Sequence, residues 1–313
     1  MSDSLSLQSS NSQNLAGARS VGKPGRREQA GLRRRRKPRN KNSLLSVLLT
    51  YGVLISGALL TVLPLVFSIL ISFRTERDLI NNGALSWPET ITLDNYVRLF
   101  TDHDFIVPLA VTVQVVIVMV IGQFTASILA AYAFARLEFP GRDVLFWAYI
   151  STMMIPAIVT VIPLFTMMSQ WGLRNTFAGI VVPFMLGSPY AIFLLRQNFR
   201  AVPQEILDAA ELDGAGFWRQ LWSIVLPMNR PILVTLFLIT VVSQWNNFLW
   251  PSIIAPNKEW NVLTVATAGL QTQYTSNWTL VMAATTLAIL PLLVLFIAFN
   301  KQIVRSIGIT GLK

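Results

Sequence analysis

Six stretches of the chain contain no Asp, Glu, Lys or Arg, and each is long enough to hold a helix that crosses a membrane. A helix of about 20 apolar residues spans a hydrocarbon core of about 30 Å. The stretches lack the strict alternation of apolar and polar residues that barrel strands show, and backbone amides in lipid need partners within a helix or a closed barrel. An all-α membrane protein with six transmembrane helices is therefore predicted. The spans are expected near 45–71, 106–133, 145–168, 177–197, 231–252 and 279–300.

Several of these spans contain or adjoin a proline, which would break a helix in a soluble protein. In a membrane bundle, neighbouring helices can satisfy the carbonyl groups that a proline leaves free, so kinked helices are expected. The prolines are Pro64, Pro156, Pro163, Pro183, Pro189 and Pro291.

Composition supports a membrane protein and separates off an N-terminal tail. The chain is 53% hydrophobic and only 13% charged, whereas soluble proteins carry about 25% charged residues. Eleven of its 25 Lys and Arg residues lie within the first 41 positions, and no aromatic residue is interleaved with them. Residues 1–42 are therefore expected to be a disordered basic cytoplasmic tail, either simply solvated or touching anionic headgroups rather than nucleic acid, and 43–313 a transmembrane domain. No cysteine is present, which excludes disulfides and thiolate metal sites.

The distribution of basic residues predicts the orientation, because cytoplasmic segments carry an excess of Lys and Arg. With the N-terminus inside, 20 basic residues lie inside and five outside. Both termini are therefore expected in the cytoplasm. The main inner loop is then 198–230, and the larger outer loops are 74–104 and 253–278.

The charge-free stretches also limit the mechanism, since ionisable groups inside a membrane are costly and usually functional. The only histidine, His103, falls in an outer loop. Proton coupling and voltage sensing are thus disfavoured, whereas sodium coupling through carbonyls and hydroxyls stays open. Gly22 and Lys23 resemble the end of a phosphate-binding loop, but Pro24 stands where Ser or Thr would hold magnesium. The chain is therefore not expected to be an enzyme that hydrolyses ATP.

The inner loop 198–230 predicts two short amphipathic helices. The first can begin at Pro203, where a missing amide is harmless, and should end at Gly214, which tolerates left-handed backbone geometry. Pro227 is expected to stop the second helix before the next span. The acidic polar face of the first helix comprises Gln204, Glu205, Asp208 and Glu211. The apolar stripe of the second comprises Phe217, Trp218, Leu221, Trp222 and Val225.

The spacing inside this loop carries a resemblance to a known family. Asp208-Ala209-Ala210 is followed by three residues, Gly214, nine residues and then Ile224-Val225-Leu226-Pro227. This resembles the loop of binding-protein-dependent ABC importer permeases, in which Glu-Ala-Ala precedes Gly and an Ile-any-Leu-Pro segment. Asp208 replaces Glu, which keeps the charge but shortens its reach. The resemblance implies a type I ABC importer permease fold. It also implies that Asp208, Ala209, Ala210, Gly214, Ile224, Leu226 and Pro227 couple the chain to an ATPase.

The same resemblance implies the partners. A separate ATPase subunit would hold ATP and Mg²⁺, so this chain would bind no cofactor and no metal of its own. A complete importer would contain a second permease subunit in a heterodimer, two ATPase domains and an extracytoplasmic solute-binding protein, in a bacterial plasma membrane. No internal duplication in the sequence supplies the second half.

Further segments resemble the carbohydrate-uptake (maltose/sugar-type) subgroup and suggest sugar import. They are 86–96, 132–142, 245–251 and 308–313. The candidate pathway residues are Trp245, Asn246, Asn247 and Trp250, because aromatic faces and amides bind sugars; an interfacial aromatic belt with packing amides is the alternative. Candidate contacts with the binding protein are Gln271, Gln273 and Tyr274, for which a plain solvated loop is the alternative.

The cargo is less well defined than the architecture. A phosphorylated cargo would need basic residues near the pathway, whereas Arg74, Arg77 and Arg98 are expected in an outer loop. A neutral sugar is therefore preferred, with glycerol-phosphate, an amino sugar or a polyol as alternatives. An ion-coupled secondary carrier and a membrane enzyme are more distant possibilities.

Overall fold

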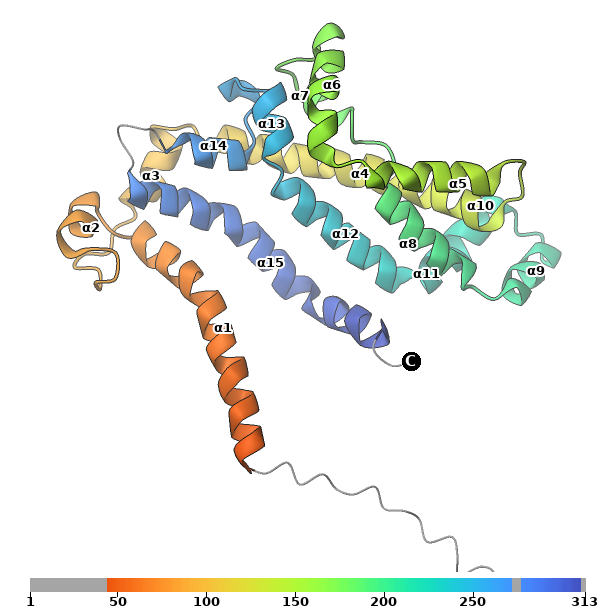
Figure 1. The fold of residues 1–313 in the computed structure, drawn as a ribbon, viewed down its shortest axis with the longest axis horizontal. Coiled ribbons are helices and arrows are strands. Elements are labelled where there is room, and N and C mark those ends of the chain that lie inside the picture. The colour runs from red at the N-terminus through yellow and green to blue at the C-terminus, as the bar shows by residue number, and fades with distance from the viewer. Residues whose placement is uncertain (1–43, 272–276, 311–313) are drawn as a thin grey trace, which may run out of the picture. The chain divides into compact units, whose positions relative to one another are not determined.

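The computed structural model describes residues 44–271 and 277–310, with side chains over 46–271 and 277–300, and the regular elements in this part are helices. The predicted tail, 1–42, lies outside the described residues. The chain divides into two units, 1–57 and 58–313. The elements labelled in Figure 1, with the short turns η2, η3 and η4 between them, are α1 (Leu44–Ser72), α2 (Glu76–Asn82), α3 (Asp94–Thr101), α4 (Ile106–Arg136), α5 (Arg142–Ser151), η2 (Thr152–Met154), α6 (Ala157–Gln170), α7 (Phe177–Val181), α8 (Pro189–Arg200), α9 (Gln204–Leu212), α10 (Phe217–Gln220), η3 (Leu221–Val225), α11 (Leu226–Met228), α12 (Arg230–Trp245), α13 (Leu249–Ile254), η4 (Lys258–Trp260), α14 (Leu263–Gly269) and α15 (Trp278–Thr310).

Four of the predicted spans match apolar segments that are long enough to cross a membrane. They cover Ser46–Ser72, Ile106–Arg136, Arg230–Ile254 and Trp278–Asn300 among the described residues. Pro64 and Pro291 lie inside α1 and α15 without ending these helices.

The predicted third span, 145–168, is sharply bent. The segments Arg142–Met154 and Ala157–Gln170 meet at an angle of 100°. Ile155, which precedes Pro156, has an extended backbone (φ −84°, ψ 116°), because a proline disfavours the helical conformation in the residue before it. The expectation of a simple kink is therefore wrong at Pro156, whereas Pro163 stays inside α6. If the bent pair counts as one span, the described chain has five candidate spans.

The predicted fourth span, 177–197, is interrupted. Residues 182–188 form turns and bends between α7 and α8. Pro183 and Pro189 remove two helical amide donors there, and Gly187 packs against α4, where an added Cβ would lie 3.3 Å from the Ser127 amide nitrogen. Helix α8 has twelve residues, about 18 Å of rise, which by itself is too short to cross the hydrocarbon core.

The end of the predicted fourth span also carries a charge. Arg196 is 4% exposed in α8. Its Nε donates to the Phe134 carbonyl oxygen at 3.1 Å, and a second nitrogen donates to Asp143 Oδ1 at 2.7 Å. The guanidinium carbon lies 3.8 Å from the centre of the Phe146 ring. The expectation of spans without charged groups is therefore wrong at this position, where hydrogen bonds, an ion pair and an aromatic face compensate for burial.

Helix α1 is apolar on all sides, and its side chains from 46 to 64 are exposed. A helix that is hydrophobic all round needs lipid or another chain around it. This exposure fits the membrane span predicted from the sequence.

Three apolar clusters hold the remaining helices. The first, which we call the loop-side core, joins the second half of α4 to α5, α8, α9, η3 and α12. The second joins the first half of α4 to α6, α7 and α13, and the third joins α3, α12, α14 and α15. Helix α8 packs along α4, as Figure 1 shows. The loop 198–230 is therefore anchored on the long helices α4 and α12.

A buried arginine organises the segment that follows α1. Arg74 is 1% exposed. Its Nε donates to Asp78 Oδ2 at 2.7 Å, and its terminal nitrogens donate to the Gly83 carbonyl oxygen and the Ser86 hydroxyl at 2.9 and 2.8 Å. Hydrogen bonds from Arg74 and Asn82 lower the pKa of Asp78 to about 2. Arg74 is thus fully engaged in holding its own loop.

Asn95 ties this loop to two long helices. Its side-chain amide donates to the carbonyl oxygens of Ser72 and Arg74 at 2.9 and 2.8 Å. Its side-chain oxygen accepts a hydrogen bond from the Thr279 hydroxyl at 3.0 Å. Because Ser72 ends α1 and Thr279 begins α15, one amide group fixes both helix ends.

Candidate functional site

The loop 198–230 contains the first predicted helix, α9, and ends it as the sequence predicts. Gly214 has φ +76°, the left-handed geometry that glycine adopts without a steric penalty. The Gly214 amide donates to the Glu211 carbonyl oxygen at 2.9 Å, and the Ala215 amide donates to that of Ala210 at 2.8 Å. These two bonds satisfy carbonyl groups that the end of a helix would otherwise leave unpaired.

The second predicted helix continues past the proline that was expected to stop it. Residues 217–220 are α-helical, 221–225 widen into a π-turn, and Pro227 lies inside α11. The Leu226 amide bonds to the Leu221 carbonyl oxygen, one residue further back than in an α-helix. The π-turn shifts the register of the backbone hydrogen bonds by one residue. This shift falls just before Pro227, which has no amide hydrogen to donate. The break falls instead at Asn229, with φ −101° and ψ 14°.

One side of α9 is exposed and acidic, and we call it the α9 face. It comprises Glu205, Asp208, Ala209, Glu211 and Leu212. Leu212 is 91% exposed, an unusual degree of exposure for a leucine on an ordered helix. No acid of the α9 face forms an ion pair within the described part of the chain; Asp208 accepts one hydrogen bond, from Gln204, at 2.9 Å. This face is therefore chemically suited to a partner surface that carries cations and an apolar pocket.

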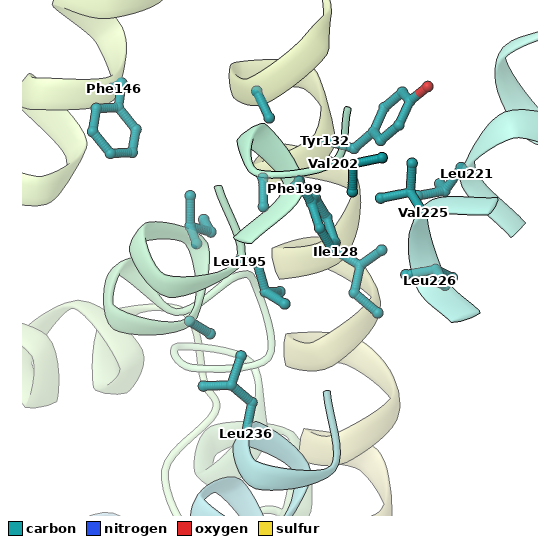
Figure 2. Close-up of a cluster of buried hydrophobic side chains, with 14 of the residues drawn as sticks. Ile128, Tyr132, Phe146, Leu195, Phe199, Val202, Leu221, Val225, Leu226 and Leu236 are labelled. Carbon is teal, nitrogen blue, oxygen red and sulfur yellow. The ribbon is translucent and has the colours of Figure 1, made fainter. Parts of the chain in front are cut away.

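The opposite side of the loop is buried in the loop-side core. Leu207 of α9 is 4% exposed, and Leu221 and Val225 are fully buried. Figure 2 shows Leu221, Val225 and Leu226 of the loop in one cluster with Tyr132 of α4 and Phe199 of α8. The Tyr132 ring meets that of Phe217 edge-on at 4.8 Å. The α9 face is thus held in place by the packed side chains of the loop-side core.

The structure separates the predicted coupling residues into two groups. Asp208 and Ala209 lie on the α9 face, with Ala210 half-buried and Gly214 at the turn. Leu226 is buried, Ile224 is half-buried against the same core, and Pro227 is exposed. Leu226 and Ile224 therefore anchor the loop in the core, whereas Asp208 and Ala209 are accessible to a partner.

The predicted apolar stripe of the second helix divides in the same way. Trp218 and Trp222 are 59% and 60% exposed, while Leu221 and Val225 face the core. Leu212 was not among the predicted contact residues, although an apolar residue two positions before the terminating glycine of an acidic helix was a usable signal. A hollow of about 450 Å³ lies between α9, α10 and the end of α4.

The predicted pathway tryptophans are buried, and each donates to a backbone carbonyl oxygen. The Trp245 indole donates to the Ala288 carbonyl oxygen at 3.0 Å, and Trp250 donates to that of Gly179 at 3.1 Å. Their exposed fractions are 7% and 4%. Both side chains therefore pack α12 and α13 against neighbouring helices.

The predicted asparagines lie at the break between α12 and α13. Asn246 is exposed, and its side chain donates to the Val242 carbonyl oxygen of its own helix, at 2.8 Å. Asn247 is half-buried. Gln244, which was not among the predicted residues, lies beside them, and its side-chain oxygen is buried with no donor among the described residues. At this break the amide side chains of Asn246 and Asn247 are therefore more accessible than the two indole rings.

Of the predicted contacts with a binding protein, only Gln271 can be located. It is exposed just after α14. Gln273 and Tyr274 lie outside the described residues.

Comparisons with known proteins agree with this architecture. Residues 122–309 match the family described as "Binding-protein-dependent transport system inner membrane component". The arabinooligosaccharides transport system permease protein AraQ of Halalkalibacterium halodurans is 32% identical over 88% of this chain and 99% of its own length. The lactose transport system permease protein LacG of Rhizobium radiobacter is 33% identical over 82% of this chain and 93% of its own. The sn-glycerol-3-phosphate permease protein UgpE of Yersinia pestis is 35% identical over 66% and 70%.

A solved structure shares the fold. It is the crystal structure of a bacterial ABC transporter involved in the import of the acidic polysaccharide alginate. The match has a TM-score of 0.75 at 23% identity and covers 82% of this chain and 96% of that one. The helices described above thus form a type I ABC permease fold. With its apolar spans and a family match that includes the whole of α9, the chain belongs to the inner-membrane components of binding-protein-dependent transport systems.

Proposed function

We propose that this chain is one permease subunit of an ATP-driven importer that moves a neutral sugar into the cytoplasm. The observation that carries this proposal is the α9 face, an exposed acidic surface held on a rigid core within a chain of this family. Such a surface is what a separate ATPase needs in order to move the membrane helices. The chain is a transport component, and ATP with Mg²⁺ would be held by the ATPase subunit.

The bends in the third and fourth spans support a second permease subunit. Residues 151–158 are exposed at the bend between α5 and α6. Irregular backbone at membrane depth is stable only where protein or a water-filled cavity covers it. A partner permease in a heterodimer would supply that cover, and an extracytoplasmic binding protein would deliver the solute from outside.

Six spans with both termini in the cytoplasm is the topology that we propose. Because the chain has no cysteine, variants with a single introduced cysteine can report the topology directly. We expect a membrane-impermeant maleimide added to intact cells to label Glu89→Cys, in the outer loop, and to label Glu205→Cys only after lysis. Labelling of Glu205→Cys in intact cells would show that the orientation is the reverse of the one proposed. Each variant should first be shown to support uptake.

A neutral sugar is preferred over a phosphorylated cargo. Relatives are named for arabinooligosaccharides, lactose and diacetylchitobiose, and another for sn-glycerol-3-phosphate. Arg74 is buried with its donors already engaged, and Arg98 pairs with Asp102 at 3.5 Å. The Arg74 guanidinium is therefore not free for a phosphate, which would need such charge-assisted contacts, and Arg98 already faces an acid.

Within the membrane, we assign the cargo contact to the break at Asn246 and Asn247. Asn246→Ala is expected to lower sugar uptake severalfold while assembly with the ATPase stays unchanged, because the hydrogen bond of this side chain within the described residues is internal to its own helix. The control is Ser252→Ala, which also removes a helix-internal hydrogen bond, here from a half-buried side chain nearby. Equal uptake by wild type and Asn246→Ala would show that Asn246 does not contact the cargo.

The function is tested by reconstituting the chain with its partner permease, ATPase and binding protein in proteoliposomes. We expect uptake of a labelled neutral oligosaccharide that requires ATP and is not inhibited by glycerol-3-phosphate. Transport of glycerol-3-phosphate alone would establish the alternative cargo. Uptake without ATP, driven by a sodium gradient, would overturn the importer assignment.

A further inference from the structure

One guanidinium group connects the ends of three helices beneath the α9 face. Arg136 is the last residue of α4. Its Nε donates to the Phe199 carbonyl oxygen at 3.0 Å, and one terminal nitrogen donates to the carbonyl oxygens of both Phe199 and Val202. The other terminal nitrogen donates to Gln204 Oε1 at 2.8 Å. Phe199 lies in the last turn of α8, Val202 follows that helix, and Gln204 begins α9.

The acceptors explain why an arginine occupies this position. The last carbonyl groups of a helix have no partners within it and carry partial negative charge, which a nearby cation stabilises. Arg136 forms no ion pair within the described part of the chain. Its charge therefore acts on the end of α8. The planar fork of a guanidinium reaches several acceptors at fixed angles, which the single ammonium of a lysine cannot do.

The surroundings make this joint stiff. Tyr132, one turn earlier in α4, is buried and packs edge-on against Phe199 at 6.4 Å. Val202 is 5% exposed and Leu207 of α9 is 4% exposed within the same core. A displacement of α9 must therefore move α8 and the end of α4 together, provided that the bonds of Arg136 hold.

We propose that Arg136 is a positioning residue that makes α4 and α8 follow the movement of α9 when the ATPase closes. The inference rests on the proposed function and goes beyond it, because it assigns force transmission to a residue outside the loop that binds the ATPase. Arg136 contacts neither ATPase nor solute in this role. Its loss should therefore separate ATP hydrolysis from transport.

The test compares Arg136→Lys with wild type in the reconstituted complex, with Arg142→Lys as the matched control. Arg142 lies in the turn after α4 and bonds within that turn, to the Leu137 carbonyl oxygen at 3.2 Å. For Arg136→Lys we expect normal co-purification of the ATPase, ATP hydrolysis within about twofold of wild type, and a fall of roughly tenfold in sugar taken up per ATP, as expected when hydrogen bonds to a cation are lost. Arg142→Lys should keep the wild-type ratio.

A further variant keeps the inference falsifiable if Arg136→Lys is poorly folded. Gln204→Ala removes one of the acceptors of Arg136 and should lower the same ratio by a smaller factor. Parallel loss of hydrolysis and uptake in Arg136→Lys, or an unchanged ratio in both Arg136→Lys and Gln204→Ala, would overturn the positioning role. Absence of ATP-dependent uptake in the wild-type complex would instead refute the proposed function, and this inference with it.

Discussion

Gly214→Val is expected to release the ATPase from the purified permease complex while the permease itself stays folded. Gly214 has φ +76° with no atom within 4 Å of an added Cβ, so the penalty comes from the backbone alone. A residue with a side chain loses about 1–2 kcal/mol in this conformation, and a β-branched one is a clear outlier there. The turn must then open, which displaces the end of the α9 face. Since 1.4 kcal/mol corresponds to a factor of ten in binding, we expect roughly tenfold less ATPase at equal permease concentration.

The neighbouring Gly216 provides a matched control. It lies in the same loop, also with open space around an added Cβ, but its φ is −70°. Gly216→Val should therefore retain the ATPase. Gly214→Asn should retain more ATPase than Gly214→Val, because asparagine tolerates left-handed geometry. If Gly214→Val and Gly216→Val release the ATPase equally, the effect lies in side-chain bulk at the interface rather than in the turn.

Arg74→Met is expected to give the largest loss of stability among the substitutions considered. It leaves the Asp78 carboxylate, which is 4% exposed, without its main partner. Removing one member of a buried ion pair is among the most destabilising single changes, and we expect the melting temperature in detergent to fall by about 10 °C. Arg77→Met, an exposed arginine three residues away, should change it little. Equal effects at both positions would show that the loss reflects net charge rather than the buried network.

Acid titration supplies a second signature of the same pair. The pKa of Asp78 is about 2 in the folded protein, chiefly because of the hydrogen bond from Arg74, and about 3.9 in an unfolded chain. Since the folded pKa is the lower one, the carboxylate stabilises the protein above about pH 4, and this contribution is lost as the pH falls towards 2. The melting temperature of wild type should therefore drop more steeply between pH 4 and 2 than that of Arg74→Met. Identical slopes would exclude Asp78 as the titrating group.

The sequence by itself determined the architecture wherever the signal is local. Continuous apolar stretches predict α1, α4, α12 and α15, because a span in lipid must be apolar along its whole length. The amphipathic pattern and Gly214 predict α9 and its end, because capping depends on a few neighbouring residues. The loop spacing also indicated the family. Topology and the role of the tail stay predictions.

Only the tertiary structure decided how the prolines and polar groups are used. Pro156 separates α5 from α6, whereas Pro64 and Pro291 stay inside helices; the outcome depends on what packs beside each proline, which a single chain segment does not encode. Packing likewise placed Trp245 and Trp250 against backbone carbonyl groups and buried Arg196 beside Asp143 and Phe146. Arg136 shows this best. Its acceptors lie more than 60 residues away in sequence, so its role appears only once α8 and α9 have folded against α4.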